Sequence, residues 1–251
     1  ATVISQAVSG VGIAAYVLLK EPELLPDRDS FRFGKKTLTE VIRHSLAACI
    51  QQSVMNFGIL MIQGLVNSFG PAVMAAFAAA VKIDSFAYMP AQEFGNAFSL
   101  FISQNYGARE FKRINSGIRK ALIISVAFCL TISLFIFILA PYLMQIFVDV
   151  SKQGIIHTGV AYLRIEGSFY FCIGILFLLY GFYRGIEKSE MSLILTVISL
   201  GTRVMIAYML APIQNIGVSG IWWAIPIGWI LADIVGVYRA VITLSAFHHM
   251  K

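Results

Sequence analysis

The sequence predicts an all-α membrane protein, in which a six-helix transmembrane bundle is preceded by one further transmembrane helix. Hydrophobic residues make up 58% of the 251 residues and charged residues only 13%, whereas soluble domains average about 25% charged. The charged residues cluster between long uncharged blocks, and several blocks exceed the roughly 18 apolar residues that cross a bilayer. This composition argues against a soluble globular domain and against a disordered chain.

Seven apolar segments follow one another along the chain, and each is predicted to be a helix. Lipid offers no hydrogen bonds to exposed backbone, and the sequence lacks the alternation typical of a membrane β-barrel. The segment 71–104 is too long to cross straight, and Pro90 and Gly95 interrupt it, so it is expected to bend or tilt. The segments cover residues 1–19, 45–69, 71–104, 119–147, 155–183, 191–211 and 217–243.

Three regions are predicted from this pattern. Residues 1–19 form a helix that ends a preceding lobe, and residues 20–44 form a linker with a short surface helix near 37–44. Residues 45–251 form the six-helix bundle. Because the chain opens without Met and without a basic lead, it is interpreted as a fragment.

The positions of Lys and Arg predict the orientation of the chain in a cell membrane. One set of alternate loops holds nearly all of these residues, against only Lys152 on the opposite side. The positive-inside bias therefore places the linker and the C-terminus in the cytoplasm. The net charge of +6 is thereby explained by topology, so the expected partner is the lipid bilayer and not nucleic acid.

No pattern of reactive residues predicts an enzyme. Cys49, Cys129 and Cys172 lie singly in apolar stretches and are interpreted as packing residues, so no metal site is expected. The sequence has no GxSxG, HExxH, Walker loop or CxxC motif. With no nucleotide-binding loop and no cofactor expected, an Na⁺ or H⁺ gradient is the available energy source.

The segment 45–69 carries four amide side chains on one helical stripe. Gln52, Asn56, Gln63 and Asn67 are separated by 4, 7 and 4 positions, which the 3.6-residue period places on one face. Such a face predicts the wall of a polar cavity. The alternative is that the amides bond to neighbouring helices.

The segment 71–104 repeats this polar pattern. Lys82 and Glu93 are 11 positions apart, close to three full turns, and Asn96 lies on the same side. Two polar faces on adjacent helices predict a shared aqueous cavity. Tyr88 and Met89 offer aromatic and sulfur surface for apolar cations, with plain packing as the alternative.

Glu93 is the candidate for ion coupling, because a carboxylate shielded from bulk water can exchange a proton or Na⁺. The alternative is a local structural bond. The other intramembrane charges are predicted to be structural, with Glu166 pairing near the outer surface beside Arg164 and the rest finding buried partners. They are Asp84, Arg164, Glu166, Arg203 and Asp233.

Several motifs in fixed order resemble the multidrug and toxic compound extrusion (MATE) family. The run SQNYGAREFKR at 103–113 is similar to the family's Gln-Asn-x-Gly-Ala signature, which stands where a long helix enters a basic cytoplasmic loop. The supporting matches are YLRI at 162–165, YRGIEKSEM at 183–191, RVMIAYML at 203–210 and GVSGIWWAIPIGW at 217–229.

The resemblance implies a twelve-helix plan in two lobes, of which this chain is the C-terminal lobe and the end of helix six. It further implies an antiporter that exports organic cations or drugs in exchange for Na⁺ or H⁺ by alternating access, together with an N-terminal lobe of the same protein. Some members use a Glu on helix seven with an Asp on helix ten, where this chain has amides on segment 45–69 and Glu166 on segment 155–183.

Two other functions stay open. A lipid-linked oligosaccharide flippase of the same superfamily needs a more cationic cavity, which Lys82, Arg164 and Arg203 allow. A non-transporting membrane subunit, in which a lone lobe acts with a partner, is the third.

Overall fold

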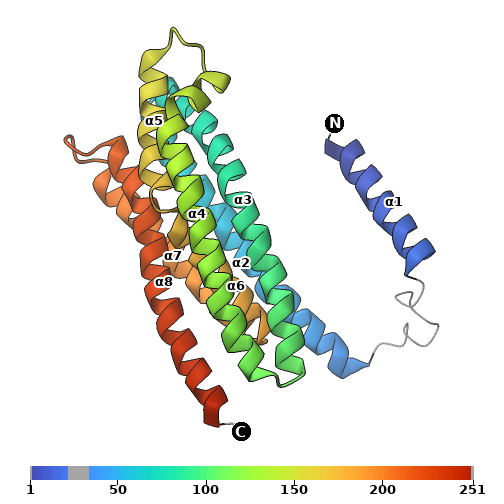
Figure 1. Ribbon diagram of the computed structural model, residues 1–251. Helices are drawn as coiled ribbons and strands as arrows, with labels where there is room; N and C mark the ends of the chain where they lie inside the picture. Colours follow the sequence, from blue (N-terminus) through green and yellow to red (C-terminus); the bar gives the residue numbers. More distant parts are fainter. Residues whose placement is uncertain (1, 22–33, 250–251) are drawn as a thin grey trace. The chain divides into compact units, whose positions relative to one another are not determined.

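The computed structural model describes residues 2–21 and 34–249, and all regular secondary structure in these two ranges is helical. Eight helices follow one another (Figure 1). They are α1 (Thr2–Lys20), α2 (Lys35–Asn67), α3 (Pro71–Gly107), α4 (Phe111–Phe147), α5 (Gln153–Gly167), α6 (Tyr170–Gly185), α7 (Ser189–Leu210) and α8 (Val218–His249).

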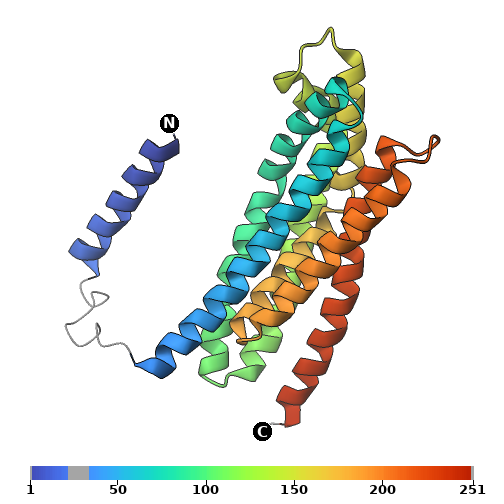
Figure 2. The same cartoon turned by 180° about the vertical axis from the view of Figure 1, so that it is seen from behind.

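The chain divides into two compact units, Ala1–Ser45 and Leu46–Lys251. In the first unit, α1 is an apolar helix of 19 residues whose described side chains are nearly all exposed. The second unit contains most of α2 and all helices from α3 to α8, which run up and down side by side (Figures 1 and 2). The functional residues discussed below all belong to this second unit.

The lengths and apolarity of the helices confirm the predicted membrane fold. Six of the described helices are long and apolar enough to cross a bilayer, and α5 with α6 makes a seventh span if the bent pair counts as one. The seven apolar segments of the sequence correspond to these spans. The chain is an integral, multi-pass membrane protein.

The segment 155–183 differs from the single helix expected there, because it is broken between α5 and α6 with a bend of 52°. The hydroxyl of Ser168 donates to the carbonyl of Arg164 at 2.6 Å, and the Phe169 N–H turns back to Glu166 at 3.0 Å. These bonds satisfy the carbonyl groups that a continuous helix would pair with later residues. The sequence pattern missed the break because no proline marks it.

The short surface helix expected near 37–44 is the beginning of α2, which runs from Lys35 without interruption. Most of the predicted linker, residues 22–33, lies outside the described residues. The proposed borders at 19/20 and 44/45 remain predictions.

Glycines allow α3 and α6 to pack closely inside the second unit. A Cβ atom at Gly181 would collide with the carbonyl oxygen of Gly95, and one at Gly95 would lie 2.8 Å from the carbonyl oxygen of Phe177. Backbones that approach this closely require residues without a side chain. The backbones of the two helices thereby lie close together beside the site described below.

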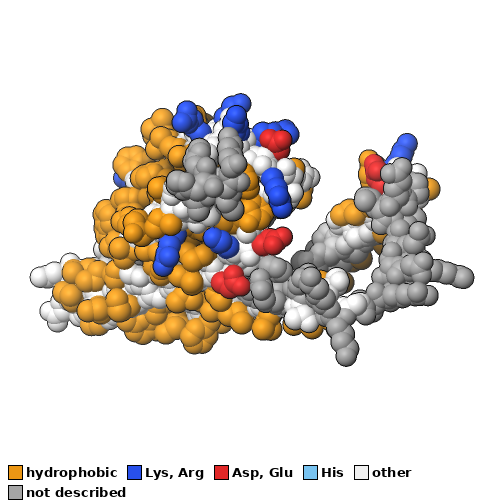
Figure 3. All heavy atoms as spheres, turned by 90° about the horizontal axis from the view of Figure 1, so that it is seen from below, with side chains coloured by type: hydrophobic (Ala, Val, Ile, Leu, Met, Phe, Trp, Pro, Cys, Tyr) orange, Lys and Arg blue, Asp and Glu red, His pale blue; other side chains and the backbone are white. Residues whose placement is uncertain are grey.

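One end of the bundle is basic. The turn between α3 and α4 and the turn between α6 and α7 lie at this end (Figures 1 and 2). Figure 3 shows Lys and Arg side chains gathered on it, with few acidic ones. This asymmetry is the pattern on which the orientation of the chain was predicted.

Candidate functional site

A cavity of about 420 Å³ lies among the helices of the second unit. Side chains of α2, α3, α5, α6, α7 and α8 line it, so it is formed by helices that lie far apart in the sequence. Its polar and charged lining residues are Gln63, Lys82, Asp84, Tyr88, Gln92, Tyr162, Glu166, Tyr180, Thr196, Ser199 and Arg203.

Two buried carboxylates lie in the wall of this cavity. Asp84 of α3 is 4% exposed and Glu166 of α5 is 3% exposed. The hydroxyl of Tyr170 donates a hydrogen bond of 2.6 Å to Oδ1 of Asp84, and Tyr162, which also lines the cavity, precedes Glu166 by one helical turn. The acids are close enough to interact electrostatically with one another. Two like charges in one buried site cost free energy, which a cation or a proton between them would remove.

Arg203 of α7 is a basic residue near the two carboxylates. These three residues, with Tyr162 and Tyr170, are named the acidic cluster. Arg203 acts electrostatically on both Asp84 and Glu166, and it is half-buried. Within the described part of the chain, Oε2 of Glu166 and Nε of Arg203 are buried without a hydrogen-bond partner. Unpaired buried atoms are rare in folded proteins, so these two atoms are available to a ligand, an ion or water in the cavity.

The break between α5 and α6 positions two members of the cluster. Glu166 is the residue before the last one of α5, and Tyr170 is the first residue of α6. The bend turns both side chains into the bundle, where each reaches the cavity or its carboxylates. Broken helices present polar groups to the substrate and ion sites of many secondary transporters.

Aromatic rings form a second wall of the cavity. Phe77 and Tyr162 line it with their ring centroids 5.5 Å apart. Behind them the buried Trp222 stacks on Phe77 at 5.4 Å and meets Tyr162 edge-on at 4.9 Å. Aromatic faces attract organic cations that approach within about 6 Å. The cavity therefore combines a surface for apolar cations with an acidic cluster.

The structure brings three of the predicted cavity residues to this site, namely Gln63, Lys82 and Tyr88. Gln52 and Asn56 lie elsewhere on α2, where the amide of Gln52 donates to Oδ1 of Asn56 at 3.3 Å. All four amides of the stripe are exposed in this chain. Asn67, Met89 and Asn96 are also exposed and contribute nothing to the lining of this cavity.

Glu93 lies on the exposed side of α3, outside the lining of the cavity. Its Oε2 accepts a hydrogen bond of 3.2 Å from Nδ2 of Asn96. Oδ1 of Asn96 in turn accepts a bond of 3.0 Å from Arg184 of α6. This is the local bonding that was the alternative to ion coupling for Glu93, and it links α3 to the end of α6.

The expected surface pairing of Glu166 with Arg164 is wrong. Glu166 faces the core, whereas Arg164 is exposed and lies 5.2 Å over the ring of Phe137, with Nε 3.4 Å from the Phe137 carbonyl oxygen. Two positions apart on a helix, the side chains point about 200° away from each other. The signal that could have found the site was the spacing of Tyr162 and Glu166, which shares one helical face.

Asp233 of α8 is a further buried acid, 8% exposed, and its Oδ1 has no hydrogen-bond partner among the described residues. It does not line the cavity. Its place in the bundle makes it a matched comparison for Asp84 and Glu166, because all three are buried carboxylates of the same unit.

Two known proteins similar to this chain are described as probable multidrug resistance proteins. A protein described as "Probable multidrug resistance protein NorM" from Thermotoga maritima is 27% identical over 248 residues, which cover 98% of this chain and 51% of that protein. One described as "Probable multidrug resistance protein YpnP" from Bacillus subtilis is 30% identical over 159 residues, covering 63% of this chain and 35% of that protein.

Solved structures share the fold. A structure described as the outward-facing conformation of a multidrug resistance MATE family transporter of the MOP superfamily has a TM-score of 0.89 and 23% identity. The similarity covers 99% of this chain and 56% of that one. Nearly all of this chain matches these relatives, but it spans only about half of their length. The MatE family model matches residues 46–209, more than half of the chain, and the chain belongs to the MatE family of membrane transporters.

Proposed function

We propose that this chain forms one lobe of an exporter of organic cations or drugs, driven by an Na⁺ or H⁺ gradient through alternating access. The observation that carries the proposal is the buried pair of Asp84 and Glu166 in the wall of an aromatic-lined cavity. The relatives described as probable multidrug resistance proteins support the substrate class. The basic end of the bundle would face the cytoplasm of the cell membrane.

The carboxylate pair would couple ion and substrate because it is more stable with a cation or a proton than without one. A state of the transporter that holds the ion at the pair would differ in free energy from a state that has released it. An organic cation that enters the same cavity would compete for the negative charge, so export and ion uptake would alternate. One charge moving through about 100 mV releases about 2.3 kcal/mol, which sustains about a fifty-fold substrate gradient.

The test is transport by the intact protein in proteoliposomes, with ethidium as the organic cation. A pH gradient without Na⁺ and an Na⁺ gradient at equal pH are imposed in separate experiments, and one of them is expected to drive export. Asp84→Asn and Glu166→Gln should each lower the gradient-driven rate of export at least tenfold. An amide side chain has no net charge and does not take up or release a proton as a carboxylate does.

Asp233→Asn is the matched control, since it removes a buried carboxylate of the same unit outside the cavity. It is expected to keep gradient-driven export within about twofold of the unsubstituted rate. Gel filtration of each variant verifies that it is folded. Export at the unsubstituted rate by Asp84→Asn and Glu166→Gln would refute the proposed coupling site.

A second function, the movement of a lipid-linked oligosaccharide across the membrane, is favoured by one observation. Lys82 and Arg203 both line the cavity, and two cations suit a pyrophosphate. In cells, Lys82→Gln would then abolish glycan export and leave ethidium retention unchanged. In a cation exporter, Lys82→Gln would instead change ethidium retention and leave glycan export unchanged.

A further inference from the structure

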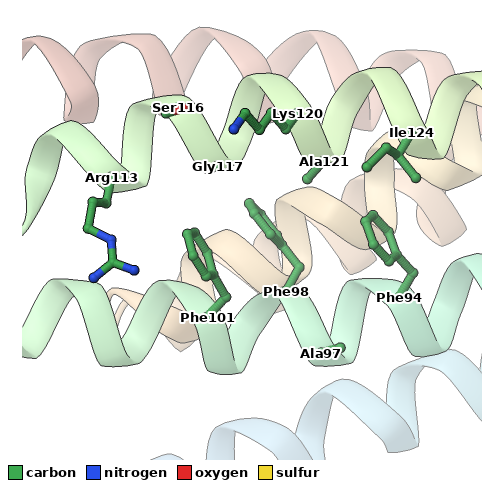
Figure 4. A pocket seen from close by; sticks show the side chains of 10 residues that line it. All are labelled: Phe94, Ala97, Phe98, Phe101, Arg113, Ser116, Gly117, Lys120, Ala121 and Ile124. Carbon is green, nitrogen blue, oxygen red and sulfur yellow. The ribbon is translucent and has the colours of Figure 1, made fainter.

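A second cavity, of about 470 Å³, lies between α3 and α4 in the half of the bundle that carries the turn joining these helices. Phe94, Phe98 and Phe101 line it from α3, and Arg113 and Lys120 line it from α4 (Figure 4). None of the residues of the polar cavity described above belongs to it. It is therefore a separate feature of the bundle.

The apolar and basic parts of this second cavity are separated along its length. In Figure 4 the three phenylalanine rings project from α3 toward α4 in a row. Arg113 points back toward α3 at one end of the row, and the amine of Lys120 is directed along α4 toward that same end. A Cβ atom at Gly117 would collide with the ring of Phe101, so this glycine makes room for the ring.

The two basic side chains are exposed and have no opposing charge in the cavity. No Asp or Glu is among the lining residues. In the part of the chain that the structure describes, neither the side chain of Arg113 nor that of Lys120 makes a hydrogen bond or an ion pair. The cavity thus presents uncompensated positive charge at its polar end.

The length of the cavity along α4 matches the length of a lipid acyl chain in one leaflet of a bilayer. Its α4 residues run from Arg113 to Ile124, which is about 16 Å along a helix axis at 1.5 Å per residue. One leaflet of the hydrocarbon core is about 15 Å thick. Arg113 follows the start of α4 at Phe111 by two residues, so the polar end lies at the edge of the span.

We propose that this cavity binds an anionic phospholipid, with its phosphate between Arg113 and Lys120 and one acyl chain along the three phenylalanines. Two cations favour a headgroup of net negative charge over a zwitterionic one. The phenylalanine row favours a lipid over free phosphate, because only the lipid gains free energy from apolar contact. The proposal is independent of the substrate that the protein moves.

Native mass spectrometry of the intact protein in detergent tests this site, with dioleoyl phosphatidylglycerol or dioleoyl phosphatidylcholine added singly. Each basic residue next to the headgroup is expected to strengthen binding about fivefold, so phosphatidylglycerol should be retained at least fivefold more. The double variant Arg113→Gln with Lys120→Gln should lose this preference. Both residues are exposed, so their replacement leaves the fold intact.

The matched control is the double variant Lys112→Gln with Arg119→Gln. It removes the same charge from the same helix, one position away from each cavity residue and outside the lining. It should retain phosphatidylglycerol within about twofold. Equal losses in the two double variants would show diffuse attraction to the basic end and overturn the site.

A second variant tests the apolar part without changing any charge. Ala97 is an exposed lining residue, and Ala97→Trp would fill the space of the acyl chain. Retention of phosphatidylglycerol should fall at least fivefold while the unfolding temperature stays unchanged. Unaltered retention in Ala97→Trp, or displacement of the lipid by inorganic phosphate, would refute a lipid site.

Discussion

The hydroxyl of Tyr170 lies 2.6 Å from Oδ1 of Asp84 and donates a hydrogen bond to it, although 86 positions separate the two residues. The bond joins the first residue of α6 to the middle of α3. Tyr162 of α5 lies one helical turn before Glu166 and lines the same cavity. Asp84 is therefore oriented by a tyrosine hydroxyl, and the helix break sets the position of that tyrosine.

Replacing Tyr170 by Phe should weaken both the fold and the coupling. The variant removes the donor and leaves a buried carboxylate oxygen unpaired, which costs about 1–2 kcal/mol within a membrane bundle. The free energy of unfolding in detergent should fall by about this amount, and gradient-driven ethidium export should decrease.

Tyr183→Phe is the control for this prediction. Tyr183 is also buried, and its hydroxyl donates a 2.7 Å bond to the carbonyl of Gly236, away from the carboxylates. The control should lose a similar amount of stability and keep its transport rate once folded. If both variants lose transport equally, Tyr170 has no specific role at the acidic cluster.

Two glycines should respond to alanine with opposite signs. Gly181→Ala places a Cβ atom against the carbonyl of Gly95 in the close packing of α3 and α6, and such overpacking costs about 1–3 kcal/mol. Gly201 of α7 has open space around it, so alanine there should stabilise the helix by about 0.5–1 kcal/mol. Thermal unfolding of the two variants checks this, and a shift in the same direction for both would contradict the described helix packing.

Glu93→Gln should leave export nearly unchanged. A glutamine oxygen still accepts the bond from Asn96, and a surface substitution changes stability by about 0.5 kcal/mol or less. Asn96→Ala breaks the bridge from Glu93 to Arg184 and should lower the unfolding temperature more. Loss of transport in a stable Glu93→Gln variant would instead indicate that Glu93 is the ion-coupling residue.

Water in the polar cavity can be probed with single cysteines. In a background with the exposed Cys49 changed to Ser, Gln63→Cys should react with a charged thiosulfonate reagent at least tenfold faster than Phe135→Cys. Phe135 is 61% exposed on α4 and is expected to face lipid. Equal reaction rates would mean that Gln63 does not face water. Cys129 and Cys172 are buried and should stay unlabelled.

The membrane spans could be predicted from the sequence because the bilayer imposes their length. A block of about 20 apolar residues must be a helix in lipid, whatever it packs against. The same local rule failed at the break between α5 and α6. That break depends on side-chain hydrogen bonds such as the one from Ser168 to Arg164, which no apolar count reveals.

Helical spacing also found part of the site. The period of 3.6 residues put Gln63 and Lys82 on polar faces, and both line the cavity. The residues that it grouped with them, such as Asn56 and Glu93, lie outside the lining. It could not tell that Glu166 faces the core, because Arg164 beside it suggested a surface. Nor could it bring Asp84 to Tyr170, which lies on a different helix.

By itself the sequence determined that the chain crosses a membrane several times, which end of the bundle is basic, and which side chains share a helical face. These properties depend on neighbouring residues and on the solvent, so a short stretch of sequence is enough to predict them. Only the tertiary structure decided which face meets which helix, and therefore that two carboxylates, two tyrosines and Arg203 converge. That choice depends on how glycines and bends let helices approach, and it is a property of the packed bundle as a whole.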